Sequence, residues 1–223
     1  MGARELLAEG AAAPQERGRG ELTGLVELGP GLHRWTARHP DADSNPDPGS
    51  PADWGPDVGC VAYQGPTHLI LIDPLVPDER PDLRDALGEL LRRGGRRRHV
   101  AILTTLKFHR RSRDELLMYF FDAPVPNPEG VEKVPIRGAG ETMMWIPEHR
   151  ALVPGDRLIG DDAGGLRLCP DSWLRYLPSG MRAPELREAL RPLLDLPVEM
   201  VLASHGEPVL RQGRDAIARA LER

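Results

Sequence analysis

Histidine and aspartate residues lie directly after several predicted strands of this 223-residue chain. Asp73 ends the apolar run LILI, Asp156 follows the segment ALVPG, and His205 follows the segment VLAS. Imidazoles and carboxylates can transfer protons or hold a metal ion. Each residue also has a structural interpretation, because His205 could hydrogen-bond a strand end and Asp156 could cap a turn.

Other catalytic signatures are missing from the sequence. It contains no Gly-x-Ser-x-Gly nucleophile elbow, no Gly-Lys-Ser/Thr phosphate loop, and no Gly-x-Gly-x-x-Gly opening a helix. Ser204 and His205 are neighbours, but adjacent side chains of a strand point to opposite faces. This pair is therefore no evidence for a nucleophile and its base.

The elements that must position these residues follow from hydrophobic patterning. Strands are predicted at 24–28, 31–37, 58–63, 68–72, 99–104, 132–136, 142–146, 151–153 and 198–203. Helices are predicted at 81–93, from Ser112 to the prolines that begin at Pro124, at 183–195 and at 211–221. Residues 112–115 fit a capping box, and the helix after it is expected to turn Leu116, Leu117, Phe120 and Phe121 inward.

This order of elements predicts one domain rather than two. Each half of the chain places strands in the middle and helices outside, so two packed sheets covered by helices explain the pattern best. The fold class is α/β (α+β), a four-layer αββα sandwich over residues 21–223. Residues 1–20 are predicted to be a disordered arm.

Two tryptophans have distinct expected roles. Residues 39–57 form a long loop rich in Pro, Asp, Gly and Ser, which is either a binding loop or a disordered insertion. Trp54 near its end is the candidate for a lid over a pocket. Trp145 alternates with Met143 on a predicted strand and is expected in the core. The acids of the loop 161–165 could bind metal, although a solvated turn is the favoured interpretation.

The ordered set of strand-end motifs resembles the metallo-β-lactamase superfamily. The segment LIDP at 71–74 resembles its first motif, a buried strand ending in Asp. The segments GETMMWIPE at 140–148 and ALVPGD at 151–156 resemble its central hairpin, and ASHGEPV at 203–209 resembles its final motif. The resemblance spans roughly residues 24–221, and it implies a metal site at the edge of the sandwich, on loops that follow strands.

The resemblance also shows that most metal-ligand positions have changed. The family's His-x-His-x-Asp-His motif falls on Thr105, Lys107, His109 and Arg110, in that order. The histidine before the central hairpin falls on Arg137. Asp156 and His205 keep the expected residue type, and His109 is a possible substitute ligand.

Three hypotheses follow from these substitutions. A guanidinium cannot bind a metal, so Arg137, together with Lys107, could occupy the metal position and pair with Asp156. Alternatively, Lys107, Arg110 and Arg137 could form an anion site for a carboxylate or phosphate. In both cases the two-metal site is lost and no cofactor is expected.

The third hypothesis keeps one metal ion. His109, Asp156 and His205 would supply two imidazoles and a carboxylate, a set suited to Zn²⁺ or Fe²⁺. The resemblance then implies a hydrolase of an ester, amide or thioester. Enzyme and non-catalytic binding protein therefore both stay open, with His109, Asp156 and His205 as candidate catalytic residues and Lys107, Arg110, Arg137 and Trp54 as candidate ligand-binding residues.

Composition bounds the partners and the compartment. The net charge of −5 argues against a nucleic-acid partner, and the basic run 92–98 is interpreted as a helix end. No secretory signal or membrane span is visible, so a cytoplasmic location and no membrane partner are expected. Cys60 and Cys169 are expected to be reduced and buried. A small-molecule ligand or substrate is the expected partner, and the anion-site hypothesis makes it anionic.

Overall fold

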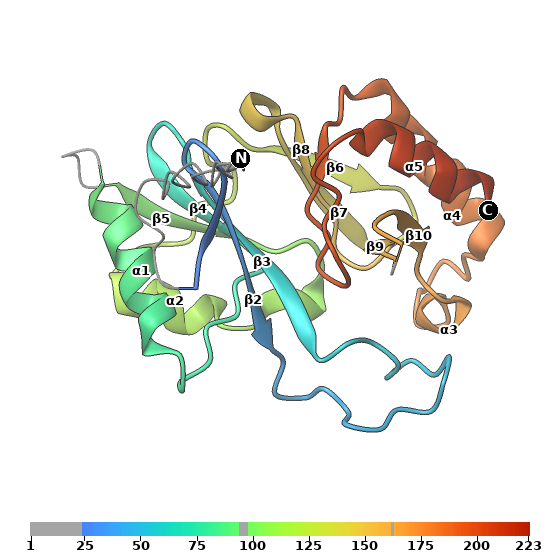
Figure 1. Ribbon diagram of the computed structural model, residues 1–223, viewed down its shortest axis with the longest axis horizontal. Coiled ribbons are helices and arrows are strands. Elements are labelled where there is room, and N and C mark those ends of the chain that lie inside the picture. Colours follow the sequence, from blue (N-terminus) through green and yellow to red (C-terminus); the bar gives the residue numbers. More distant parts are fainter. Residues whose placement is uncertain (1–23, 94–97, 162) are drawn as a thin grey trace, which may run out of the picture.

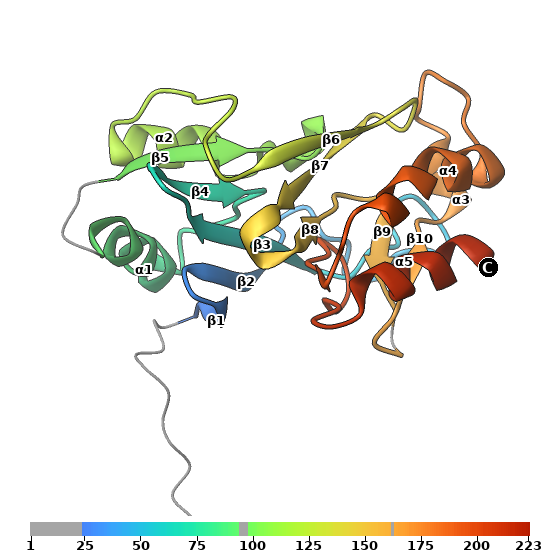
Figure 2. The ribbon, with the colours of Figure 1, turned by 90° about the horizontal axis from the view of Figure 1, so that it is seen from above.

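The computed structural model describes residues 24–93, 98–161 and 163–223 (Figure 1). The predicted N-terminal arm, the middle of the basic run and Asp162 lie outside the described residues. Two mixed sheets face one another, and helices cover the outer face of each (Figure 2). The predicted αββα sandwich is confirmed.

The first sheet carries the residues from the N-terminal half of the chain. Its strand order is β1-β2-β3-β4-β5, and only the last pair is parallel. The strands span Val26–Gly29, Leu32–Arg38, Asp57–Gln64, His68–Ile72 and His99–Leu103. Because β4 and β5 run parallel, their carboxyl ends lie side by side at one edge of the sandwich.

The second sheet repeats this arrangement. Its order is β11-β8-β7-β6, with β11 and β8 parallel and the other pairs antiparallel. The strands β6, β7, β8 and β11 span Glu132–Ile136, Glu141–Ile146, Ala151–Val153 and Met200–Val201. A separate hairpin pairs β9 (Leu158–Gly160) with β10 (Leu166–Leu168).

Helices from each half cover the outer face of the sheet of that half. In Figure 2, α1 and α2 lie beside the first sheet, and α4 and α5 lie beside the second. The α-helices α1 to α5 span Pro81–Arg92, Arg113–Phe120, Asp171–Leu174, Ala183–Leu190 and Gly213–Glu222. Short 3-10 turns η1, η2 and η3 span Lys107–Arg110, Pro147–His149 and Arg191–Asp195.

Alternation along the strands divides the core into three layers. On β4, Leu69 and Leu71 pack toward the helices, whereas Ile70 and Ile72 pack between the sheets. All four side chains are fully buried, which explains why this strand is apolar without interruption. The apolar layer between the sheets packs the two sheets against each other. It therefore fixes the position of the edge where β4 and β5 end relative to the corresponding edge of the second sheet.

The second sheet alternates in the same way. Met144 and Ile146 of β7 face the first sheet, and Met143 and Trp145 face α4 and α5. Trp145 is 4 % exposed, so its predicted place in the core is confirmed. The two cysteines are buried free thiols, as predicted.

Two local predictions at α2 are wrong. The Ser112 hydroxyl makes no cap hydrogen bond to the helix, because it accepts one from the backbone N–H of Val76 at 2.9 Å instead. Phe121 is 92 % exposed rather than inward, because the chain leaves the helix there with a left-handed backbone (φ 56°). The predicted helix 183–195 also tightens into the 3-10 turn η3 after Leu190.

None of the helices in the described residues combines the length and the apolar character needed to cross a membrane.

Candidate metal centre

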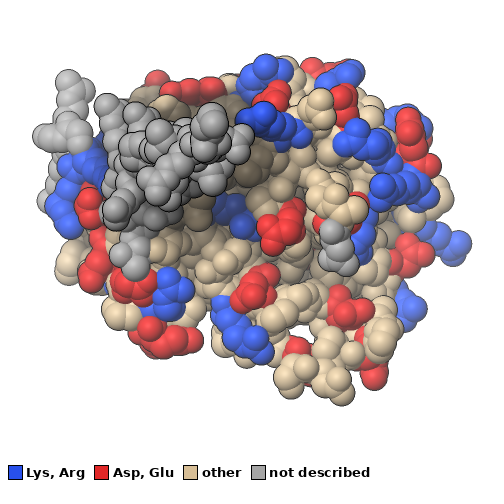
Figure 3. All heavy atoms as spheres, in the orientation of Figure 1, with Lys and Arg blue, Asp and Glu red and all other residues tan. Residues whose placement is uncertain are grey.

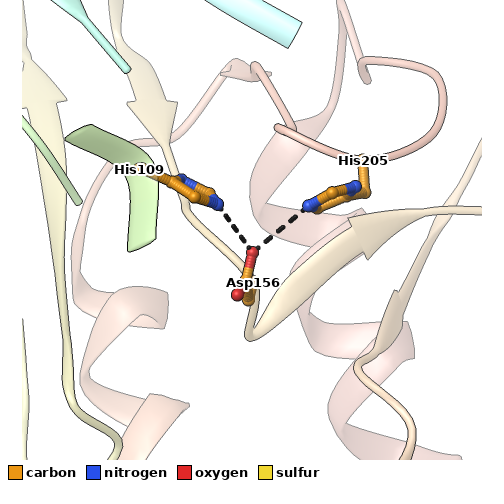
Figure 4. A group of neighbouring side chains, drawn as sticks. All are labelled: His109, Asp156 and His205. Carbon is orange, nitrogen blue, oxygen red and sulfur yellow. Dashed lines mark ion pairs between the residues drawn. The ribbon is translucent and has the colours of Figure 1, made fainter. Parts of the chain in front are cut away.

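Three side chains from both sheets meet at the edge where the parallel strand pairs end (Figure 4). His109 lies in η1 after β5, Asp156 follows β8, and His205 follows β11. Side chains at the carboxyl ends of neighbouring parallel strands are directed to the same edge of a sheet, and here the edges of two sheets adjoin. The fold therefore brings together residues that are up to 96 positions apart, from 109 to 205.

The three donor atoms converge on a small volume. His109 Nε2 lies 3.0 Å from Asp156 Oδ1, and His205 Nε2 lies 3.3 Å from the same oxygen. One nitrogen or oxygen atom from each side chain falls within 4.8 Å of the other two. The structure therefore brings together the three residues that the one-metal hypothesis named.

The carboxylate oxygen of Asp156 has an unusual environment. Both ring nitrogens approach it within ion-pair distance, yet neither contact has hydrogen-bond geometry, so this buried oxygen has no hydrogen-bond partner among the described residues. A buried unpaired acceptor is costly unless something else satisfies it. Both imidazole nitrogens therefore lie around the same carboxylate oxygen.

His109 is oriented by a buried polar network. Its Nδ1 lies 2.8 Å from Asp73 Oδ2, which also accepts the Thr105 hydroxyl proton at 2.6 Å. The backbone N–H of Thr105 donates to the other oxygen of Asp73 at 2.8 Å. Because Nδ1 faces Asp73, Nε2 is left to face Asp156.

The loop that carries Asp156 is held by a second buried carboxylate. Glu141 accepts backbone N–H groups of Gly155, Asp156 and Arg157 at 3.0, 2.8 and 3.0 Å. A side chain at position 155 would meet Thr105 Oγ1 at 2.5 Å, so glycine is required where the two loops touch. Asp156 is therefore placed by its backbone as well as by its side-chain contacts.

His205 is held by aromatic packing. Trp54 and Trp173 both approach its ring edge to face, with ring centroids 5.6 and 5.4 Å away. Trp54 also packs against His39 in the long loop, at 5.1 Å. The Nδ1 atom of His205 is buried without a hydrogen-bond partner in the described part of the chain.

The site tunes the pKa values of its members in opposite directions. Burial alone would lower the pKa of His109, but the carboxylates of Asp73 and Asp156 outweigh it and raise the pKa to about 9. Burial lowers the pKa of His205, because the single carboxylate of Asp156 does not compensate. Burial also opposes ionisation of Asp156, but the two histidines hold its pKa well below the usual range.

Glu141 shows the opposite balance. Burial and the neighbouring carboxylate of Asp156 raise the pKa of Glu141 to about 7, against the effects of Arg157 and of the backbone N–H groups. A cation next to Asp156 would relieve part of this repulsion.

Sequence reasoning missed Arg111, the basic residue that ties the two sheets together at the site. Its Nη1 donates to the carbonyls of Asp73 and Gly59 at 2.8 and 3.2 Å, and its Nη2 donates to Ser204 Oγ at 2.8 Å. Its charge acts to lower the pKa of both His109 and His205. Nothing in the sequence separates Arg111 from its neighbour Arg110; only the turn of the backbone after η1 does.

Two of the three cations predicted to surround the site, Arg110 and Arg137, do not do so. Arg110 is exposed and lies 3.5 Å from Asp114 of α2. Arg137 is exposed in the turn between β6 and β7, whereas the ion-pair partners of Asp156 among the described residues are the two histidines. The predicted pairing of Arg137 with Asp156 is therefore not observed. Of the three, only Lys107 lines the cavity beside the site.

The remaining predicted site residues divide similarly. Trp54 lines the cavity, as expected of a residue over a pocket, and Trp173 lines it from the other half of the chain. Asp161 closes its own turn by accepting the backbone N–H groups of Ala163 and Gly165. This supports the favoured interpretation of the loop 161–165 as a turn.

Solved structures of the same fold support this arrangement of the chain. A metallo-β-lactamase from Erythrobacter litoralis has a TM-score of 0.58 at 14 % identity, over 89 % of this chain and 90 % of its own. DIM-1 metallo-β-lactamase has a TM-score of 0.55 at 10 % identity, over 89 % and 96 %. TMB-1 gives 0.53 at 12 % identity, over 89 % and 96 %.

These comparisons establish the fold. No protein-family model matches the sequence, and no curated protein sequence matches it. The chain has the metallo-β-lactamase fold, as the strand-end motifs predicted, at identities too low to carry an activity across.

Proposed function

We propose that this protein is a metal-dependent hydrolase in which His109, Asp156 and His205 hold a single Zn²⁺ or Fe²⁺ ion. The observation that carries the proposal is the convergence of two imidazole nitrogens on one buried carboxylate oxygen, at 3.0 and 3.3 Å. Ligands about 2 Å from a tetrahedral zinc ion lie roughly 3.3 Å from one another. The spacing of these donors therefore fits one ion.

The surroundings of the donors support the same proposal. A metal-binding histidine usually donates its other ring N–H to a carboxylate, which fixes the tautomer. Asp73 is the carboxylate that faces Nδ1 of His109 as acceptor, at 2.8 Å. The lowered pKa of His205 favours its neutral, metal-binding form, whereas an ion must displace a proton from His109, whose pKa is raised to about 9.

In the described ranges 24–93, 98–161 and 163–223, a second ion has no comparable set of donors. The aligned motif positions hold Thr105, whose hydroxyl is bonded to Asp73, and the exposed cations Lys107 and Arg110. The guanidinium of Arg111 also places a fixed positive charge beside the site. Loss of the two-metal arrangement is thus compatible with a remaining one-metal site.

When bound, such an ion acts as a Lewis acid and makes water a stronger nucleophile near neutral pH. The contribution of the chain is to hold and orient the donors. Asp73 and Thr105 fix the ring of His109, Glu141 fixes the loop of Asp156, and Trp54 and Trp173 pack against the ring of His205. The reaction we propose is hydrolysis of an ester, amide or thioester.

The test is elemental analysis of the purified protein with zinc and iron titrations of a chelated sample. We expect one ion per chain, and at least a tenfold loss of affinity in His109→Ala, Asp156→Ala and His205→Ala. Arg137→Ala is the matched control, because Arg137 is exposed and should leave affinity unchanged. Folded wild-type protein that binds neither ion, or binds two, contradicts the proposal.

Hydrolysis is tested separately on the loaded protein. A panel of ester, thioester and amide substrates should show turnover that falls with His205→Ala and survives in Arg137→Ala. Metal binding without turnover of any substrate in the panel would support the metal site and contradict the hydrolase function.

A further inference from the structure

A cavity of about 610 Å³ opens directly onto the three donor side chains. This volume is within the range of pockets for small molecules, roughly 300–1,000 Å³. Most of its wall away from the donors is apolar, and includes Trp54, Leu106, Phe108, Trp173, Tyr176 and Leu177. The wall therefore favours a ligand with an apolar part.

Two aromatic side chains on this wall are largely exposed. Phe108 of η1 is 67 % exposed, and Tyr176 after α3 is 69 % exposed. They come from the two halves of the chain and share one cavity with Trp54 and Trp173. Exposed aromatic surface gathered at one hollow is typical of a ligand site, because an apolar ligand removes it from water.

The charged groups of the cavity are not equivalent. Arg111 and Arg157 use their guanidinium groups in buried bonds to the protein, for example Arg157 Nε to the carbonyl of Ala139 at 2.9 Å. Lys107 is exposed, and its ammonium lies 4.7 Å from the centroid of the Phe108 ring. Within the described residues Lys107 makes no ion pair, so its charge is open to a ligand at the mouth. Among the lining residues that the structure describes, Asp41 of the long loop is the one exposed carboxylate.

We propose that the cavity binds small esters or thioesters. Their acyl part would be an apolar chain or ring, and the end remote from the ester or thioester bond would be anionic. This inference rests on the proposed hydrolase function and names its substrate class. The acyl part would pack on Phe108, Trp173 and Tyr176, and the anionic end would lie near Lys107. Polynucleotide substrates fit poorly, because acidic and basic side chains are interspersed on the face drawn in Figure 3 and the chain carries a net charge of −5.

The first experiment measures binding to the metal-free protein, so it does not depend on catalysis. Butanoate, octanoate and octanol are titrated calorimetrically, with tryptophan fluorescence as a second signal from Trp54 and Trp173. Each fully buried methylene contributes about fourfold in affinity. Even partial burial of the longer chain of octanoate should therefore make it bind at least about tenfold more tightly than butanoate. Equal binding of the two carboxylates would overturn the proposal.

Two pairs of variants separate the apolar wall from the cation. Phe108→Ser should weaken octanoate binding about threefold to tenfold, while Phe121→Ser, an exposed phenylalanine that is not on the cavity wall, should not. Lys107→Ala should weaken octanoate binding about threefold and leave octanol unchanged. Lys133→Ala is its control, because Lys133 is exposed and is the only other lysine of the chain. If Phe108→Ser and Lys107→Ala both match their controls, the inference fails.

The second experiment uses the metal-loaded protein and nitrophenyl esters of two to eight acyl carbons. We expect kcat/KM to rise with chain length, mainly through KM, and the rise to shrink in Phe108→Ser. If octanoate binding depends on Phe108 but no ester is turned over, the hydrolase function is refuted and the proposed ligand class is retained. If kcat/KM does not depend on acyl chain length, the proposed ligand class is refuted and the hydrolase function is retained.

Discussion

The two histidines of the candidate centre are held in different ways. His109, from the half of the chain that forms the first sheet, has its outer nitrogen in a network with Asp73 and Thr105. His205, from the half that forms the second sheet, has no hydrogen-bond partner for its Nδ1 among the described residues, and its ring packs against two tryptophans. One ring is oriented by directional bonds and the other by shape.

This difference predicts unequal sensitivity to mutation. Hydrogen bonds in a dry environment are strong and directional, and an unpaired partner is costly. Aromatic packing is less directional, and a smaller apolar side chain preserves part of it. Mutations next to His109 should therefore affect the site more than mutations next to His205. Mutation of a residue that links the two sides should affect it most.

The largest effect is expected for Arg111→Met, which removes the link between the two sides. Three acceptors on Asp73, Gly59 and Ser204 would lose their donor, so the free energy of unfolding should fall by about 2–4 kcal/mol. Urea denaturation measures this. The control is Arg110→Met, whose exposed side chain should contribute less than about 0.5 kcal/mol. Similar stabilities of the two variants would refute the linking role of Arg111.

Asp73→Asn should have the next largest effect. The amide has one oxygen, so it can no longer accept from the backbone N–H of Thr105 and from the ring of His109 at once, and metal affinity should fall about 10- to 100-fold. Competition with a chelating dye measures the change. Asp122→Asn is the matched control, because Asp122 accepts from His99 at 2.7 Å far from the centre. An affinity within about twofold of wild type would show that Asp73 does not orient the ligand.

Glu141→Gln should act through the loop of Asp156 rather than through a ligand. One end of the amide would present N–H groups to backbone donors that now meet the carboxylate. We expect unfolding to become easier by about 1–2 kcal/mol, with Glu132→Gln on the exposed side of β6 as control. An unchanged urea midpoint would show that this contact is dispensable.

Trp54→Leu should have the smallest effect on the metal. Trp173 still packs against His205, so we expect metal affinity to change less than about threefold. Octanoate binding should weaken more than metal binding, since Trp54 lines the cavity. A tenfold or greater loss of metal affinity would show that the site is as sensitive to changes around His205 as to changes around His109.

Much of the fold was predictable because its strands are strongly patterned. The continuous run of β4 marked a strand buried on both faces, and the Pro-Glu and Gly-Asp ends of β7 and β8 marked the central hairpin. The short hairpin β9–β10 and the helix α3 were not predicted. Their segments have three or four residues each, too few to establish a period.

The donors were predictable by residue type, but their surroundings were not. His109, Asp156 and His205 could be named because imidazoles and carboxylates at strand ends are distinctive. Arg137 was misplaced because counting back from Gly140 gives a position and no side-chain direction; positive φ angles at Gly138 and Gly140 turn the chain there. Arg111 was missed because its role depends on a backbone turn with φ 38°.

The assembly of the centre from both sheets links ion binding to global folding. Separation of the sheets parts His109 from the other two donors, since His109 follows a strand of one sheet and Asp156 and His205 follow strands of the other. An ion that binds only the closed sandwich stabilises it by mass action, by about 2.7 kcal/mol at one hundred times its dissociation constant. The melting temperature of this protein should therefore report the free zinc or iron concentration of its surroundings.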